Sequence, residues 1–167
     1  MGINKIEEHI ENVLKKYELI MPDAPAALGL YAPVKEAGDS LYFLSGCLPV
    51  QNGKPMYTGK LGKELTVEDG RQAARYCVLN LLANIRKEAG DLSAIRKIVK
   101  LTVFVACDND FYKQPDVANG ASQLLIELFG EEAGRAARSA VGVNALPGNY
   151  PVEIEAIVEV GKRVKFL

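Results

Sequence analysis

The sequence contains one histidine, His9, and no tryptophan among its 167 residues. Nucleophilic hydrolases commonly pair a serine or cysteine with a histidine, and His9 lies in a charged stretch that offers no such partner, so we expect an ordinary surface residue. Also missing are a Walker A loop, a GxGxxG turn, an HExxH helix and a GxSxG elbow. Any chemistry must therefore use arginine, glutamate, tyrosine, serine and backbone groups.

The three cysteines, Cys47, Cys77 and Cys107, form neither a CxxC pair nor a cysteine–histidine ligand set. We therefore expect no metal and no cofactor. An odd number of thiols behind an N-terminus too charged for an export signal is typical of a cytoplasmic protein with reduced, buried cysteines. Core packing is the favoured interpretation for all three.

Long hydrophobic runs and an excess of basic charge are also lacking. No segment approaches the roughly 18 apolar residues that a membrane helix needs. Twenty basic residues face 21 acidic ones, for a net charge of −1, which argues against nucleic acid as the main partner. With 49% hydrophobic and 25% charged residues, the composition is globular, and we expect residues 1–167 to form one domain.

The first part of the chain predicts a helix followed by strands. Apolar residues recur at helical spacing over residues 4–18, with Asn4 as the expected N-cap. Prolines in residues 21–25 then end the helix, and residues 29–58 have strand-like patterning, clearest over 41–45. Asn52-Gly53 predicts a hairpin turn within residues 51–54.

The second part alternates helices with strands. Thr66 and Asp69 resemble a capping box at the start of a long helix that Gly90 ends. A central strand is expected over residues 98–107, a helix over 117–129 stopped by Gly130, and two strands over 139–143 and 152–160 around a turn at 146–149. This order predicts an α+β fold whose helices cover one face of a sheet.

The C-terminal strands carry the most informative charges. Alternation along residues 152–160 places Glu153, Glu155 and Glu159 on one face, and Arg138, on a strand expected to be the neighbour, is a natural counter-charge. This arrangement fits a structural ion pair or a solvated sheet face. It also fits a ligand site, where the guanidinium binds a carboxylate and a glutamate directs water, although the pattern alone favours the structural interpretation. A shift of one residue in register would change which glutamate faces a cleft.

Four blocks of sequence resemble the Rid/YjgF family of reactive-intermediate deaminases, also labelled endoribonuclease L-PSP. They are residues 24–31 (APAALGLY), 44–50 (LSGCLPV), 102–105 (TVFV) and the stretch from Arg138-Ser139 to 152–156 (VEIEA). The resemblance implies a chorismate-mutase-like α+β fold, with a mixed β-sheet and two long helices packed on one face. Residues 1–20 then form an additional N-terminal helical extension. It also implies a homotrimer with ligand clefts between subunits.

The resemblance further implies hydrolysis of reactive 2-imino acids, formed from enamines such as 2-aminoacrylate, to 2-keto acids and ammonia. Carried over by position, Arg138 grips the substrate carboxylate and Glu153 directs water at the imine carbon. The implied pocket residues are Tyr31, Ser45, Gly46, Asn119 and Ala140. Ala140 stands where many members carry a cysteine, which puts substrate choice rather than fold in question.

The residues themselves leave simpler roles open. Tyr31 equally suits packing at a sheet edge, Ser45 the end of a strand, and Gly46 a bulge or turn. Two further functions also remain: a carboxylate-binding trimer without turnover, and an RNA-cleaving translation inhibitor, which the weak basic charge disfavours.

Overall fold

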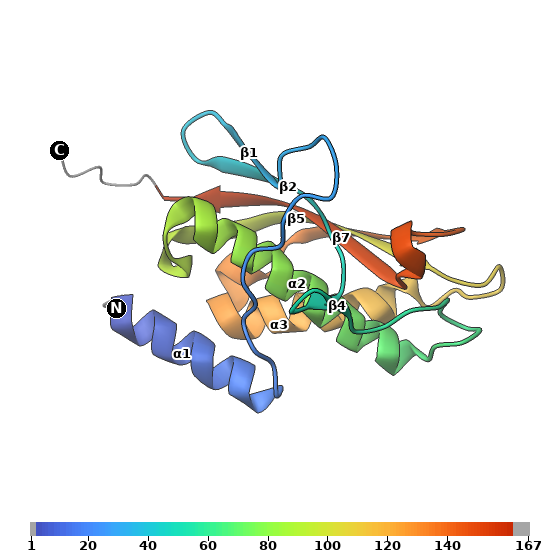
Figure 1. The fold of residues 1–167 in the computed structure, drawn as a ribbon. Helices are drawn as coiled ribbons and strands as arrows, with labels where there is room; N and C mark the ends of the chain where they lie inside the picture. The colour runs from blue at the N-terminus through green and yellow to red at the C-terminus, as the bar shows by residue number, and fades with distance from the viewer. Residues whose placement is uncertain (1–2, 162–167) are drawn as a thin grey trace.

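The computed structural model describes residues 3–161 (Figure 1). The chain contains three helices, seven strands and two short 3-10 turns within that range. In chain order, the helices and strands are α1 (Ile3–Lys16), β1 (Val34–Ala37), β2 (Leu41–Cys47), β3 (Val50–Gln51), β4 (Lys54–Pro55), α2 (Val67–Ala89), β5 (Ile95–Ala106), α3 (Gln114–Gly134), β6 (Ala137–Val143) and β7 (Val152–Val160).

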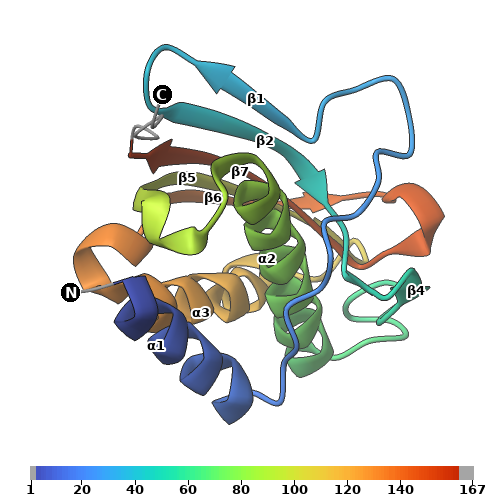
Figure 2. The ribbon, with the colours of Figure 1, turned by 60° about the vertical axis from the view of Figure 1, so that its left-hand side comes forward.

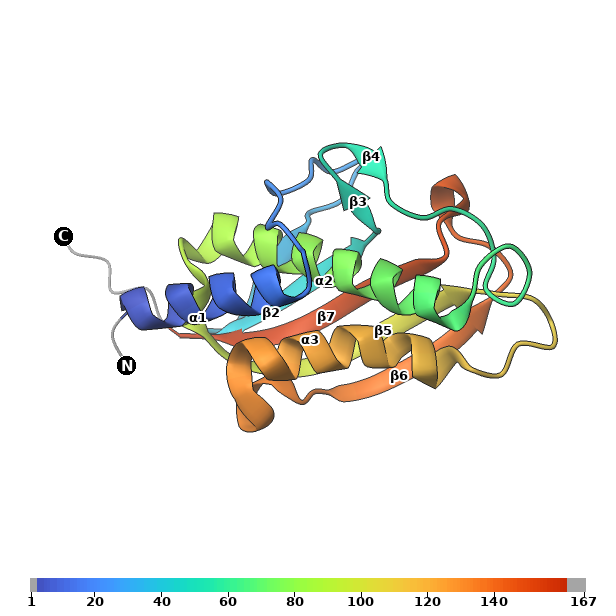
Figure 3. The same ribbon diagram turned by 90° about the horizontal axis from the view of Figure 1, so that it is seen from below.

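Five strands form one mixed sheet in the order β1-β2-β7-β5-β6. β5 and β6 run parallel, and the other neighbours are antiparallel. Figures 2 and 3 show α1, α2 and α3 on the same side of this sheet, so its opposite face is left open. The predicted α+β fold, with two long helices on one sheet face and an N-terminal helix, is confirmed.

Local sequence signals set the best-defined boundaries. At the start of α2, Thr66 Oγ1 accepts from the Asp69 backbone N–H at 3.2 Å, and the Asp69 carboxylate accepts from the Thr66 N–H at 2.8 Å. These bonds form the predicted capping box. The Thr66 hydroxyl also donates to the Asp69 carboxylate at 2.7 Å, and this bond, followed by the one from the Thr66 N–H, lowers the pKa of Asp69. In the β3–β4 hairpin, Asn52 and Gly53 adopt φ values of 52° and 74°, the left-handed conformations that an Asn-Gly turn requires.

Other boundaries differ from the prediction. α1 begins at Ile3, so Asn4 lies inside the helix and is not its N-cap. α3 begins at Gln114, three residues before the predicted start, because Pro115 is favourable in a first helical turn. Gly130, with φ 83° and ψ 169°, does break the regular helix as predicted, but another helical turn follows it to Gly134.

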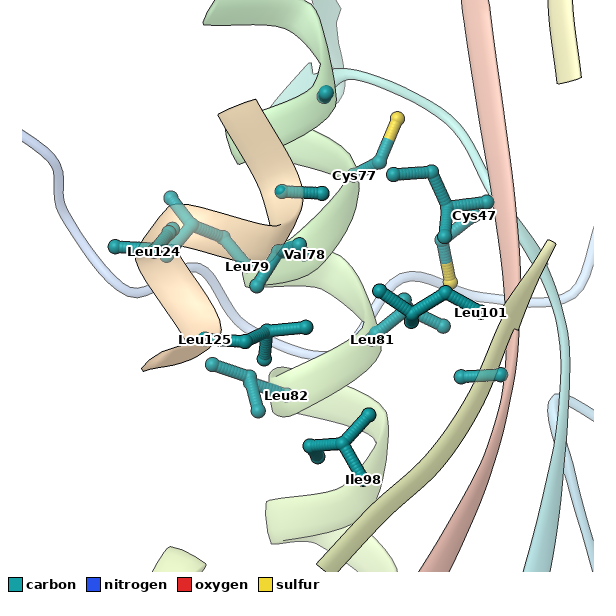
Figure 4. Packing of buried hydrophobic residues seen from close by; sticks show 14 of the residues in the cluster. Cys47, Cys77, Val78, Leu79, Leu81, Leu82, Ile98, Leu101, Leu124 and Leu125 are labelled. Atoms are coloured by element: carbon teal, nitrogen blue, oxygen red, sulfur yellow. The ribbon is translucent and has the colours of Figure 1, made fainter. Parts of the chain in front are cut away.

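The core fills the space between the helices and the sheet (Figure 4). Leu82 of α2, Leu124 of α3 and Leu101 of β5 are at most 1% exposed, and each such side chain contributes about 1.5–3 kcal/mol on burial. All three cysteines are buried and free, as expected. Burial raises the pKa of the Cys47 thiol to about 12, which excludes a thiolate there at neutral pH.

Hydrogen bonds to Glu127 of α3 hold α1 and the residue after it against α3. Lys16 Nζ and Tyr17 OH donate to the two carboxylate oxygens of Glu127, at 2.8 and 2.5 Å. His9 is exposed, as predicted, and its Nε2 lies 2.8 Å from the Glu127 carbonyl oxygen. The apolar side of α1 joins the core through Ile10, Val13 and Leu14. Over residues 3–161, no helix is both long and apolar enough to cross a membrane.

Candidate functional site

The site begins at an irregularity in β2. Leu44 pairs with Ala156 and Cys47 pairs with Ile154, so the two residues Ser45 and Gly46 lie opposite one residue of β7. This is a β-bulge, a device that redirects side chains and is frequent beside active sites. The predicted pocket residues Ser45 and Gly46 therefore lie where the β2–β7 ladder opens.

Gly46 makes room for a carboxylate. A Cβ atom on Gly46 would lie 2.0 Å from Oε1 of Glu153 and 2.8 Å from its Cδ, so only glycine fits beside this side chain in its present position. Glu153 is half-buried. Desolvation raises its pKa, and the charge of Glu155 adds to the shift. A carboxyl group in this setting is better suited to exchange a proton near neutral pH than an exposed glutamate.

A cavity of about 470 Å³ opens beside the bulge. Tyr31, Ser45 and Gly46 all line it. Ser45 Oγ donates to the Ala32 carbonyl at 2.7 Å, and the Leu28 N–H donates to Tyr31 OH at 3.3 Å. These bonds hold the loop before β1 against the cavity, so three of the five predicted pocket residues gather there.

Arg138 lies at the other end of the sheet, on the edge strand β6. Its Nη1 donates to Asn119 Oδ1 at 2.9 Å and to Ser122 Oγ at 3.0 Å, both on α3. Within residues 3–161, nothing accepts a hydrogen bond from its Nε or Nη2, so these donors remain for a ligand. Ala140 lies two residues further along β6, on the same face as Arg138.

The predicted pairing of Arg138 with the glutamates of β7 is wrong. β5 lies between β6 and β7, and Arg138 is in register with Leu101, which is buried beneath the helices. Glu153 and Glu155 instead share the open face of the sheet, where the first is half-buried and the second exposed. Neither glutamate forms an ion pair with a residue in the described part of the chain.

The predicted site residues thus form two groups in one chain. Glu153 and the cavity residues belong to β7, β2 and the loop before β1, whereas Asn119, Arg138 and Ala140 belong to α3 and β6. β6 is two strand spacings from β7 and three from β2, roughly 10 and 14 Å at about 4.8 Å each, and Arg138 and Glu153 point to opposite faces of the sheet. A substrate of a few carbon atoms cannot contact both groups of a single chain.

Sequence reasoning missed three polar residues near these groups. Ser122 accepts a hydrogen bond from the same Arg138 nitrogen as Asn119. Ser122 follows Asn119 by three residues on α3, a spacing that places both on one helix face and could have predicted its role. Asn80 and Asn84 line the cavity from α2, where they interrupt the apolar stretch of residues 77–85 at a spacing of four. No cluster of histidine, cysteine or acidic side chains within residues 3–161 could hold a metal ion.

Comparison with known proteins identifies the family. Residues 11–158 match the family described as "YjgF/chorismate_mutase-like, putative endoribonuclease". Protein TCP17 of Trypanosoma cruzi is 42% identical over 146 residues, covering 87% of this chain and 91% of that protein. The 2-iminobutanoate/2-iminopropanoate deaminase of Mus musculus is 33% identical over 142 residues, covering 85% and 90%.

Solved structures agree with this fold. Atu1372 of Agrobacterium tumefaciens, a protein of unknown function, superposes with a TM-score of 0.86 at 40% identity, covering 94% of this chain and 96% of its own. E. coli TdcF with bound serine gives a TM-score of 0.57 at 29% identity, covering 81% and 92%. The chain therefore belongs to the Rid/YjgF family and has its chorismate-mutase-like fold.

Proposed function

We propose that the protein hydrolyses reactive 2-imino acids to 2-keto acids and ammonia. The observation that carries the proposal is the half-buried Glu153 carboxyl group, held against Gly46 beside a cavity large enough for a small organic acid. Relatives from Mus musculus and Dermatophagoides farinae, named 2-iminobutanoate/2-iminopropanoate deaminases, support it at 33% and 31% identity.

The chemistry needs one carboxyl group and one cation. Arg138 binds the substrate carboxylate through the donors that Asn119 and Ser122 leave free. Glu153 takes a proton from a water molecule as the water oxygen attacks the imine carbon, and returns this proton to the imine nitrogen to give a neutral carbinolamine. Glu153 then moves the hydroxyl proton to the amino nitrogen, the C–N bond breaks, ammonia leaves and the carbonyl forms. An imine is already electrophilic, so positioning and proton transfer supply the catalysis.

In this proposal the complete site is built from two chains of a homotrimer. Arg138 of one subunit faces Glu153 and the cavity of the next, which removes the need to span the roughly 10 Å to β7 and 14 Å to β2 within one chain. The open sheet face supports such an assembly, because Phe43 and Val141 are each 43% exposed on it.

The first test is keto-acid release from freshly generated 2-iminobutyrate and 2-iminopropionate, by wild type and Arg138→Ala side by side. We expect release well above the spontaneous rate, falling at least 100-fold in the variant because the carboxylate grip is lost. Release equal to the spontaneous rate from a folded wild type would refute the deaminase proposal. Binding of 2-keto acids without turnover would then favour the carboxylate-binding alternative.

A mixing experiment tests the shared site. Arg138→Ala and Glu153→Gln each remove one of the two groups, so each homotrimer should lose most of its activity. Mixed trimers formed by coexpression contain interfaces in which both groups are intact, and activity should partly return. Mixed trimers that stay inactive would show that the two residues act within the same chain or not at all.

A further inference from the structure

The cavity extends well beyond what a small imino acid fills. Its volume of about 470 Å³ corresponds to roughly sixteen water molecules at about 30 Å³ each, whereas the imine derived from alanine has roughly six non-hydrogen atoms. About half of its lining residues are proline, alanine, leucine or valine. Two polar residues of α2, Asn80 and Asn84, interrupt this apolar lining one helical turn apart.

The orientation of the Asn80 amide is set by its surroundings. Its Nδ2 donates to the carbonyl oxygens of Leu48, Val50 and Tyr76 at 3.0, 2.8 and 3.0 Å, so Oδ1 must point away from these acceptors. Nδ2 of Asn84 similarly donates to Cys47 Sγ at 3.5 Å. The Asn80 nitrogen is therefore fully used by the protein, whereas Asn84 Nδ2 uses one of its two N–H groups, and both Oδ1 atoms are left for a ligand.

The two Oδ1 atoms accept no hydrogen bond from the described residues, although Asn80 and Asn84 are only 2% and 4% exposed. Within residues 3–161, Arg75 Nε is the only fully enclosed side-chain nitrogen or oxygen without a partner. The asparagine oxygens therefore reach accessible space, and the space that these residues line is the cavity. Two unpaired acceptors in an apolar cavity favour a ligand that donates hydrogen bonds.

We propose that this cavity is a side-chain subsite that selects 2-imino acids with an apolar stem and an uncharged hydrogen-bond donor at its end. The inference rests on the proposed deaminase function and specifies its substrate class. The stem packs on the apolar walls, and a terminal hydroxyl or amide donates to Asn80 and Asn84. Asp23 is the one charged residue of the lining and is exposed, while the Cys47 thiol stays neutral. No buried lining residue therefore carries a charge that could pair with a charged group at the end of the substrate side chain.

Imines derived from tyrosine and phenylalanine form a matched pair that differs by one hydroxyl. An amino-acid oxidase generates each imine in place, semicarbazide traps what escapes hydrolysis, and the remaining signal gives kcat/KM. We expect about a tenfold preference for the tyrosine-derived imine, the usual effect of one hydrogen bond to an otherwise unpaired buried acceptor. In Asn84→Leu, which keeps the volume and removes the acceptor, the preference should fall markedly toward one.

Asn12→Leu is the matched control, because Asn12 is exposed on α1, away from the cavity lining. It should keep the full preference. Asn84→Ala replaces Asn84→Leu if the latter does not fold. Hydrolysis of the alanine-derived imine reports on the deaminase function separately. If that imine is hydrolysed but the aromatic pair shows no preference, the subsite is refuted while the deaminase remains.

If no imine is hydrolysed, the subsite can still be tested by binding. Calorimetric titration with 4-hydroxyphenylpyruvate and phenylpyruvate then replaces kinetics. Tighter binding of the hydroxylated acid, lost in Asn84→Leu, would support the subsite without turnover. Equal or absent binding of the two acids would overturn it.

Discussion

Replacement of Gly46 by alanine should remove activity while leaving the fold intact. The added Cβ would lie 2.0 Å from Oε1 of Glu153, so the carboxylate must retreat by about 1.4 Å to reach a normal 3.4 Å contact. Gly46 does not adopt a positive φ, and alanine therefore meets no backbone strain. The Cγ and Cδ atoms of Glu153 would lie at 2.9 and 2.8 Å, so the side chain must rotate as a whole beyond its Cβ, but no backbone atom is among these close contacts.

The two consequences differ greatly in size. Moving the glutamate off its rotamer costs about 0.5–1.5 kcal/mol, and the lower entropy of an unfolded chain with alanine in place of glycine offsets about 0.4–1 kcal/mol. The free energy of unfolding should therefore change by less than about 1 kcal/mol. A misplacement of about 1 Å at a reacting group reduces the rate by roughly 100-fold, and we expect that loss in kcat for 2-iminobutyrate.

Gly161→Ala is the matched control. Its Cβ would also displace the end of a charged side chain, Nε of Arg96 at 2.9 Å, but outside the site. Both variants are compared by urea unfolding and by keto-acid release. If Gly46→Ala acts through Glu153, the double variant Gly46→Ala/Glu153→Gln loses no more activity than Glu153→Gln alone. Full activity in Gly46→Ala, or additive losses in the double variant, would refute the reasoning.

Two further predictions concern pH. Because burial raises the pKa of Glu153, kcat/KM should rise with pH through an inflection above 4.5 that is absent in Glu153→Gln. The protonated carboxyl group stabilises the folded state fully below pH 4.5, and this stabilisation is lost as pH rises through the raised pKa. At pH 8, Glu153→Gln should therefore unfold at a higher urea concentration than the wild type. Lys16 and Tyr17 lower the pKa of Glu127, so its stabilising effect is full above pH 4.5 and lost as pH falls through the lowered pKa. Urea midpoints should therefore fall less between pH 7 and pH 3 in Glu127→Gln than in wild type, and an equal fall, or the same change in the exposed control Glu132→Gln, would contradict the role of α1 docking.

Much of the fold could be predicted because its signals are local. The Thr66–Asp69 capping box and the Asn52-Gly53 turn act within a few residues, and their geometry follows from backbone conformation alone. Alternation along β7 likewise predicted its buried and open faces correctly. The end of α3 was less predictable, since Gly130 interrupts the helix without preventing a further turn.

The order of the strands was beyond the reach of local patterns. Arg138 and Glu153 are close in sequence and opposite in charge, so a pairing was the natural expectation, yet β5 inserts between their strands and the two side chains point to opposite faces. Strand order depends on which pairings bury the most apolar surface, a property of the whole chain. Asn80 and Asn84 were missed for the same reason, because only the packed structure shows what faces a polar residue in an apolar helix.

The sequence by itself determined the fold class, the family and the residue types available for chemistry, because periodicity, caps and turns are encoded over short distances. Only the tertiary structure decided that Glu153 rests on Gly46, that Asn119 and Ser122 hold Arg138, and that β5 separates the strands of Glu153 and Arg138. The physical reason is that residues distant in sequence acquire neighbours, burial and shifted pKa values only when the sheet and helices pack together.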